Sequence, residues 1–261
     1  MPSDAIIEAH AVSKSFGGVR AVVDCSLSVR RGSITGLIGP NGAGKTTLFN
    51  IIAGVLKPDH GRIVFDGEDV TGLRPHQLFA RGLLRTFQIA HEFSNLTAVE
   101  NLMMVPPQQP GESLFDTWLR PVRVARVEAS VRAKASEVIK FVGLTNVRNE
   151  LAGNLSGGQK KLLELGRTMM VDASAVLLDE VAAGVNRTLL KDLAANIQRM
   201  NRELGYTFFV IEHDMDLISR LCDPVIVMVE GSIIAEGPMS EIRGKEEIID
   251  AYFGAPAETP A

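Results

Sequence analysis

The stretch Gly39-Pro40-Asn41-Gly42-Ala43-Gly44-Lys45-Thr46-Thr47 decides the fold of this 261-residue chain. Just before it, residues 34–38 form a short apolar run that is typical of a buried strand. Just after it, Leu48, Ile51 and Ile52 recur at helical spacing. The sequence therefore predicts a strand, a glycine-rich loop and a helix in immediate succession, as in α/β proteins.

The residue types of this loop suit the binding of phosphate groups. Gly39, Gly42 and Gly44 allow a tight turn whose backbone N–H groups point inward, and the N-terminus of the next helix adds further donors. Lys45 adds a mobile positive charge, and the Thr46 hydroxyl suits Mg²⁺. The alternative is a glycine-rich turn that merely precedes a helix, but a random chain matches the bare pattern with odds on the order of one in a hundred. The residues that we expect at a bound nucleotide are Gly39, Pro40, Asn41, Gly42, Ala43, Gly44, Lys45, Thr46 and Thr47.

The composition argues against several classes of protein. A formal net charge of −4 disfavours broad electrostatic binding to nucleic acid. Cys25 and Cys222 are the only cysteines and lie far apart, so we expect neither a disulfide framework nor a metal cluster, and a reducing cytoplasm fits. The N-terminus has no signal-peptide pattern, and no apolar run approaches the roughly 20 residues that span a bilayer. A role at a membrane would therefore depend on other chains.

Periodicity and turn residues predict alternating strands and helices. Expected strands lie at residues 5–37 (several short ones), 62–66, 83–87, 175–178, 207–211, 225–229 and 233–235, and expected helices at 75–80, 97–104, 112–142 (broken near Pro121), from 155 onward, 189–204 and 246–253. We interpret residues 1–254 as one domain, with a helical subdomain of about residues 90–160 inserted into a mixed α/β core, and residues 255–261 as a disordered tail. Arg120, Arg123 and Arg126 recur every third residue, which fits a solvated helix face better than a binding face for acidic partners.

A second set of candidate residues follows the apolar run at 175–178. Asp179 and Glu180 come directly after it, which predicts that they lie at the carboxyl edge of the sheet, where open α/β folds bind ligands. Asp179 suits Mg²⁺, and Glu180 suits the deprotonation of an attacking water. Two acids that simply end a strand in solvent are the alternative, which the phosphate-binding loop makes weaker.

The third motif identifies a family. Leu155-Ser156-Gly157-Gly158-Gln159 resembles the signature of the ATP-binding cassette (ABC) family, and its position relative to the other motifs is the family's. The resemblance implies an ABC-type P-loop NTPase with an N-terminal antiparallel β part. It also implies that the signature meets the γ-phosphate of ATP bound by a second subunit. The residues involved are Ser156, Gly157, Gly158 and Gln159.

Three further positions match the family's functional residues. Gln88 matches a glutamine that contacts Mg²⁺ and couples the ATPase to its membrane partners. His213 matches a histidine that contacts the γ-phosphate, although a lone histidine at a strand end is more often structural. Phe16 matches the aromatic residue that stacks on adenine, although tyrosine is commoner there and an aromatic packed under a turn is nearly as good an interpretation.

A narrower resemblance concerns the kind of transporter. Four short segments look like those of the ATPase subunits of branched-chain amino acid importers, and the urea and short-chain amide branch of that group has similar sequences. These segments are residues 85–88, 182–186, 212–215 and 251–254. The resemblance implies ATP and Mg²⁺ as cofactors, a second ABC ATPase subunit in a homo- or heterodimer, two transmembrane permease subunits and, indirectly, a periplasmic solute-binding protein. It also implies a peripheral position on the cytoplasmic face of the inner membrane. The net charge argues against nucleic acid as a partner. The alternative is the ATPase subunit of a lipid or lipopolysaccharide exporter.

Two features bear on the partners. Val181 and Arg187 replace the family's usual prolines, and Val185 replaces a leucine, so we expect a looser loop and leave open how the two sites of a dimer communicate. We expect the membrane subunits to attach between Gln88 and the signature, with Phe93 as the best contact. Phe115 and Trp118 are other apolar candidates. Either could instead form the small core of the insertion, and for Trp118 we expect this core position.

Overall fold

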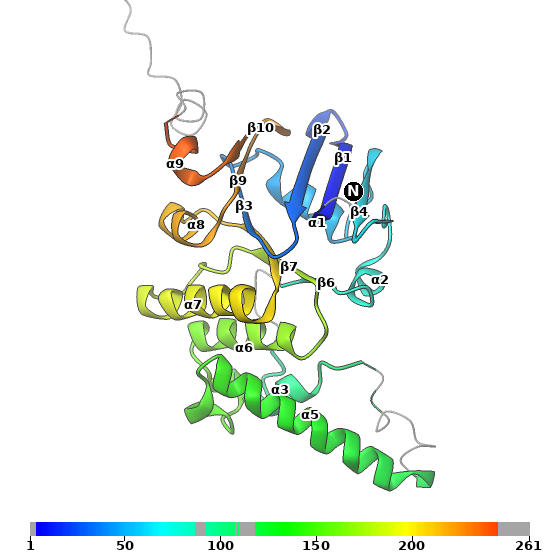
Figure 1. The fold of residues 1–261 in the computed structure, drawn as a ribbon, viewed down its shortest axis with the longest axis vertical. Helices are drawn as coiled ribbons and strands as arrows, with labels where there is room; N and C mark the ends of the chain where they lie inside the picture. The colour runs from blue at the N-terminus through cyan, green and yellow to red at the C-terminus, as the bar shows by residue number, and fades with distance from the viewer. Residues whose placement is uncertain (1–3, 87–91, 108, 110–117, 245–261) are drawn as a thin grey trace, which may run out of the picture. The chain divides into compact units, whose positions relative to one another are not determined.

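The computed structural model describes residues 4–86, 92–107, 109 and 118–244 (Figure 1). The chain divides into two compact units. The first comprises Met1–Arg85, Ser174–Ala182 and Ile197–Ala261, and the second comprises Thr86–Ala173 and Ala183–Asn196. The predicted division of the chain into one domain and a tail stays a prediction.

The first unit contains an antiparallel sheet built mainly from the N-terminal residues. Its strands are β1 (Ala5–Phe16), β2 (Val19–Arg30), β4 (His60–Phe65) and β5 (Glu68–Asp69), in the order β2-β1-β4-β5. Ile7 lies opposite Val29 on one side and Phe65 on the other, so three fully buried apolar residues meet across the sheet.

A six-stranded sheet in the same unit carries the phosphate-binding loop. Its strands are β3 (Ile34–Ile38), β6 (Leu83–Arg85), β7 (Ala175–Asp179), β8 (Thr207–Ile211), β9 (Val225–Val229) and β10 (Ser232–Gly237), in the order β10-β9-β3-β8-β7-β6. All neighbouring pairs are parallel except β10 with β9. Every residue of β3, β7 and β8 is buried, which explains their continuous apolar runs.

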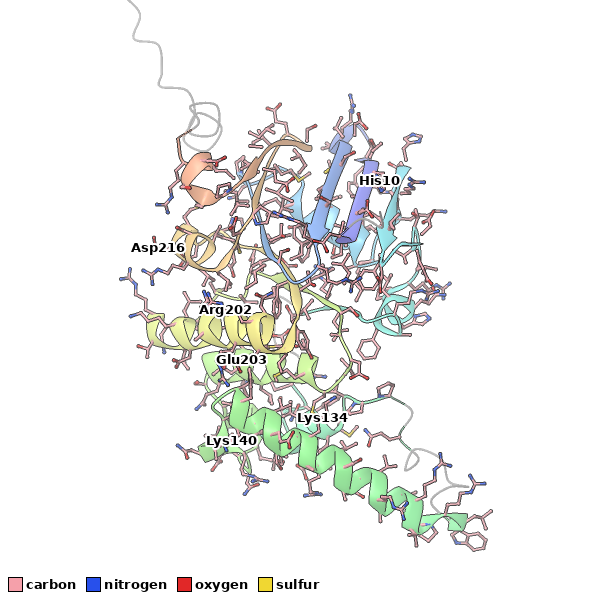
Figure 2. All side chains as sticks on the ribbon, viewed as in Figure 1. His10, Lys134, Lys140, Arg202, Glu203 and Asp216 are labelled. Carbon is pink, nitrogen blue, oxygen red and sulfur yellow. The ribbon has the colours of Figure 1, made fainter. Side chains whose placement is uncertain are left out.

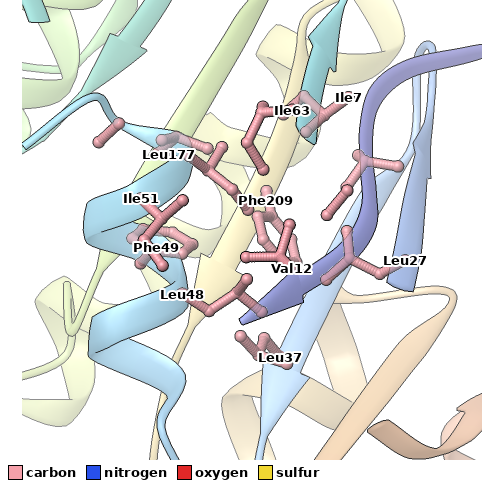
Figure 3. Packing of buried hydrophobic residues seen from close by; sticks show 14 of the residues in the cluster. Ile7, Val12, Leu27, Leu37, Leu48, Phe49, Ile51, Ile63, Leu177 and Phe209 are labelled. Atoms are coloured by element: carbon pink, nitrogen blue, oxygen red, sulfur yellow. The ribbon is translucent and has the colours of Figure 1, made fainter. Parts of the chain in front are cut away.

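Helix α1 (Lys45–Ile52) begins where the loop ends, and its apolar face is buried. Leu48, Phe49 and Ile51 join one hydrophobic cluster with residues of both sheets (Figure 3). The ring of Phe49 lies 5.2 Å from that of Phe209 on β8, measured between centroids. Burying a side chain of this size contributes about 1.5–3 kcal/mol to stability. The loop is therefore held at one end by a buried strand and at the other by a buried helix.

Three further helices of the first unit are short: α2 (Pro75–Phe79), α8 (Met215–Leu221) and α9 (Met239–Ile242). Only α2 was expected from the sequence, because Pro75 marks its first turn. Asp214 caps the N-terminus of α8, because its side chain accepts a hydrogen bond from the N–H of Leu217.

The second unit is helical in the part that the structure describes. It contains α3 (Ala98–Met103), α5 (Pro121–Phe141), the single 3₁₀ turns η2 (Thr145–Val147) and η3 (Ala152–Asn154), α6 (Gly157–Met169) and the first part of α7 (Arg187–Leu204). Thr97 caps α3 with Glu100, as the sequence predicts, since each residue bonds the backbone N–H of the other. The interruption near Pro121 is confirmed as the start of α5.

The exposure of residues on the helices agrees only in part with the predictions made from the sequence. Trp118 is 86% exposed, so the expectation that it lies in the core of the insertion is wrong. Arg120, just before α5, and Arg123 and Arg126 within it are exposed. Lys140, near the other end of α5, is also exposed (Figure 2). Among the residues described here, no helix has the length and apolar character to cross a bilayer. Phe115, Phe87, the expected helix at 246–253 and the expected tail lie outside the described residues.

Candidate active site

The glycines of the phosphate-binding loop differ in what surrounds them. A Cβ atom on Gly39 would lie 2.0 Å from the carbonyl oxygen of Met228, and one on Gly44 would lie 2.1 Å from that of Ala21. Gly44 also has a φ of +97°, a conformation that favours glycine. Gly42 has a φ of +81° but no neighbour within 4 Å of a Cβ position. The neighbouring backbone thus leaves no room for a side chain at two of the three glycines.

Lys45 points back into this loop. Its ammonium group donates hydrogen bonds to the carbonyl oxygens of Gly39, at 2.7 Å, and Pro40, at 2.9 Å. Burial lowers the pKa of Lys45, and the nearby carboxylate of Glu180 opposes that shift. The charge is thus held at the loop by neutral carbonyl groups, which phosphate oxygens can replace. In the remaining loop, Ala43 is buried, Pro40, Gly44 and Thr47 are half-buried, and Asn41, Gly42 and Thr46 are exposed.

Asp179 lies at the end of β7 beside an arginine that the sequence reasoning missed. The Nη2 of Arg85 donates to Asp179 Oδ2 at 2.7 Å, and its Nη1 donates to the side chain of Asn50. The guanidinium carbon lies 5.8 Å from the ring centre of Phe49, while the buried Nε has no hydrogen-bond partner in the described structure. Arg85 ends β6, the strand next to β7, and a charged residue at the end of an apolar strand was the available signal.

Glu180 and His213 meet at the carboxyl edge of the sheet. The Oε1 of Glu180 lies 3.0 Å from Nε2 of His213, and the two side chains are 23% and 48% exposed. Glu180 has a φ of +48°, which is rare for a residue with a side chain. Its N–H donates to the carbonyl oxygen of Ile211, the last residue of β8. The structure therefore brings together a carboxylate and an imidazole that the sequence placed at separate strand ends.

A second buried acid lies beside this pair. Glu212 is 3% exposed, and its Oε1 accepts the N–H of Ala182 at 2.7 Å. Its Oε2 accepts the N–H of His213 at 3.2 Å. Burial raises the pKa of Glu212. This residue was also missed, although it follows the apolar run of β8 just as Asp179 ends that of β7.

The signature segment lies in the second unit, at the N-terminus of α6. Ser156 Oγ accepts the N–H of Gln159 at 3.3 Å, and Gln159 Oε1 accepts the N–H of Ser156 at 2.9 Å. A Cβ on Gly158 would lie 2.3 Å from the side chain of Leu189, while Gly157 is exposed. The helix therefore begins with a complete capping box and two glycines.

Comparison with known proteins decides the family. The family model described as ABC transporter matches residues 22–183. The chain belongs to the ABC transporter family. This cassette is 36% identical, over 254 residues and 96% of each chain, to the probable branched-chain amino acid transport ATP-binding protein LivG of Archaeoglobus fulgidus. It is 36% identical to the high-affinity branched-chain amino acid transport ATP-binding protein BraF of Pseudomonas aeruginosa, covering 95% of this chain and 98% of BraF.

Solved structures agree with this family. A nucleotide-free ATP-binding cassette from an ABC transporter matches with a TM-score of 0.82 and 34% identity, covering 96% of this chain and 100% of that one. The ADP conformation of an ATP-binding cassette of an ABC transporter matches with the same TM-score and identity, covering 97% of this chain and 100% of that one. The predicted ABC-type fold, with a mixed sheet, an antiparallel sheet and a helical part, is confirmed. The chain is an ATPase of the ABC type.

Two predicted site residues of the cassette remain to be placed. Phe16 ends β1 and is 48% exposed, and the ammonium group of Lys14 lies 5.6 Å from its ring centre. Its stacking on adenine stays a prediction. Gln88 lies outside the described residues.

The oxygen donors of the cassette fit Mg²⁺. Thr46 offers a hydroxyl group and Asp179 offers Oδ1, the oxygen that Arg85 does not hold. No group of three or more potential ligands from His, Cys, Asp and Glu occurs in the described part of the chain. Mg²⁺ is typically bound by one or two carboxylates together with substrate phosphates, which is the kind of site these residues can form.

Proposed function

We propose that this ATPase drives the import of branched-chain amino acids or related amides. The relatives reported above are named for branched-chain amino acid transport, and the four short segments of the narrower resemblance support the same group. The lipid-exporter alternative is not favoured by these names. The observation that carries the catalytic part is the 3.0 Å contact of Glu180 with His213, one residue beyond the buried Asp179.

The chemistry follows from the residues around the phosphate-binding loop. Lys45 exchanges its two carbonyl partners for oxygens of the outer phosphates. Thr46, Asp179 and Gln88 would hold Mg²⁺, which would supply positive charge against the phosphates. Glu180 accepts a proton from the attacking water, and His213 beside it orients that water and contacts the γ-phosphate. Phe16 stacks on the adenine ring.

The signature is proposed to act on a second subunit. Gly157, Gly158 and the capping residues Ser156 and Gln159 present the N-terminus of α6 to the γ-phosphate that the partner ATPase holds. ATP thereby closes a homo- or heterodimer, and hydrolysis reopens it. Because the N-terminus of α6 is already ordered by its cap, little ordering entropy is lost when the pair closes.

The membrane partners are proposed to contact the segment that follows Gln88. Phe93 is 48% exposed, and the guanidinium carbon of Arg167 lies 5.6 Å from the centre of its ring. The ring therefore offers an apolar contact whose position Arg167 helps to hold. Two permease subunits would dock there at the cytoplasmic face of the inner membrane. A periplasmic binding protein would deliver the substrate, and nucleic acid has no part in this function.

One variant tests the proposed function in the assembled transporter. Glu180→Gln should keep ATP binding but slow hydrolysis about 10²–10⁴-fold, because an amide cannot accept the proton of the water. In vesicles that contain the permease, a binding protein loaded with a branched-chain amino acid or amide should stimulate the unmodified ATPase and not the variant. The matched control is Glu203→Gln, since Glu203 is an exposed carboxylate on α7 that pairs only loosely with Arg199, at 3.4 Å.

Two results would contradict this proposal. Hydrolysis by Glu180→Gln at the unmodified rate would remove the proposed base. Stimulation by a lipid, without stimulation by any loaded amino acid or amide binding protein, would favour the exporter.

A further inference from the structure

The turn Asp179–Ala182 carries two candidate functional groups in an unusual backbone. Glu180, the proposed base, has a φ of +48°, although the turn contains no glycine. The position after Glu180 is Val181, whose φ is not fixed by a ring as that of proline is. A left-handed conformation at a residue with a side chain persists only where the surroundings enforce it. Contacts from elsewhere in the chain must therefore hold this turn.

Two hydrogen bonds tie the turn to the segment that follows β8. The N–H of Glu180 donates to the carbonyl oxygen of Ile211, at 3.0 Å. The N–H of Ala182 donates to Oε1 of Glu212, at 2.7 Å. The second oxygen of Glu212 accepts the N–H of His213, at 3.2 Å. A single carboxylate thus holds the backbone that follows Glu180 and the backbone of His213 at the same time.

We propose that Glu212 is a positioning residue that fixes the turn of Glu180 against the backbone of His213, so that the two side chains face each other. This inference rests on the proposed function, because it assumes that Glu180 is the base. A carboxylate suits the task because it has two oxygens that accept hydrogen bonds, and bonds to a charged acceptor are the stronger kind. Serine or threonine offers one oxygen on a shorter side chain.

The chemistry of Glu212 argues against a role as mere packing. Its side chain is 3% exposed and burial raises its pKa, so the charged form is held in the interior against a desolvation cost. An apolar residue of similar volume would fill the same space without that cost. What an apolar residue cannot do is accept the N–H groups of Ala182 and His213.

The test separates positioning from general stability. Glu212→Ala should lower kcat about 10- to 100-fold, the range for a misplacement of about 1 Å, and leave the dissociation constant for ATP unchanged. Glu212→Gln keeps an oxygen for Ala182 but not for His213, so its kcat should lie between those of Glu212→Ala and the unmodified cassette.

Asp214→Ala is the matched control. Asp214 is a nearby carboxylate that also accepts a backbone N–H, but it holds Leu217 at the start of α8 and not the turn. This variant should lower the melting temperature and leave kcat within about threefold, since a lost N-cap costs stability.

A double variant keeps this inference distinct from the proposed function. Glu180→Gln with Glu212→Ala should hydrolyse ATP no more slowly than Glu180→Gln alone, because positioning a disabled base has no further effect. An unchanged kcat in Glu212→Ala, a parallel loss of kcat and ATP affinity, or fully additive losses in the double variant would each overturn the role of Glu212. Activity of Glu180→Gln at the unmodified rate would instead overturn the proposed base.

Discussion

The phosphate-binding loop and the turn Asp179–Ala182 both follow buried parallel strands, but their backbones are fixed in different ways. In the loop, Gly39 and Gly44 are required because neighbouring carbonyl oxygens occupy the space of a side chain. The turn has no glycine, and Glu180 adopts a positive φ under contacts from Ile211 and Glu212. The loop is marked in the sequence by its own glycines, although the carbonyl oxygens that require them belong to Met228 and Ala21. The turn has no such marker within its own residues, and its contacts also come from residues far away in the chain.

The largest expected effect is a difference between substitutions at two glycines of the loop. Gly44→Ala should abolish ATP binding, because its Cβ would lie 2.1 Å from a backbone oxygen that cannot move freely. Gly42→Ala meets no neighbour within 4 Å and should cost only about 1–2 kcal/mol of strain from its φ of +81°. Nucleotide binding and melting temperature measure both effects. Equal losses in the two variants would mean that φ alone, and not the close approach, makes glycine necessary.

A smaller effect, on the free energy of unfolding, is expected at Asp179, the first residue of the turn. Arg85→Met should lower the free energy of unfolding by about 3–5 kcal/mol, because it leaves the buried carboxylate of Asp179 without its partner. Arg31→Met is the control, since the pair of Arg31 and Asp66 is about half exposed and worth under about 1 kcal/mol. Denaturant unfolding gives both values. A loss below about 1 kcal/mol for Arg85→Met would show that distant contacts matter less to the turn than the comparison implies.

The smallest expected effect is a change of stability with pH. Because burial raises the pKa of Glu212, the folded protein holds this proton more tightly than the unfolded chain does, and stability falls as pH rises above the ordinary value of 4.5. Glu212→Gln does not titrate at this position. Its melting temperature relative to the unmodified cassette should therefore increase as the pH rises from about 4.5 to neutrality. A difference that stays constant or decreases over that range would contradict the raised pKa.

The same contrast explains which features the sequence predicted. The loop and the apolar strands rest on neighbouring residues, and so do the capping boxes at Thr97 and Ser156. Arg85 and Glu212 act through partners that lie 94 and 30 residues away. Their positions at the ends of apolar strands mark them as candidates, but no local pattern reveals the residues that they contact. The prediction that Trp118 is buried was wrong for another reason. Apolar character predicts burial only where the fold provides a surface to pack against, and Trp118 is 86% exposed.

The loop after Val181 shows how far a substitution can be interpreted from sequence. Arg187, the first residue of α7, stands where the family usually has proline. The looser loop expected from this replacement stays a prediction. Asn186 holds that helix start by accepting the N–H of Leu189 at 3.0 Å. A local cap therefore supplies part of the restraint that the missing ring would have given.

The order of strands in the six-stranded sheet has a consequence for how the cassette is made. Strand β3, which leads into the phosphate-binding loop, pairs with β8 and β9, and both are synthesised more than half the chain later. During translation β3 emerges with two open edges, which is the state most prone to pairing with a foreign strand. The loop acquires its final support only when Val225–Val229 has left the ribosome. We therefore expect a chain that ends before β9 to lack the support that holds this loop.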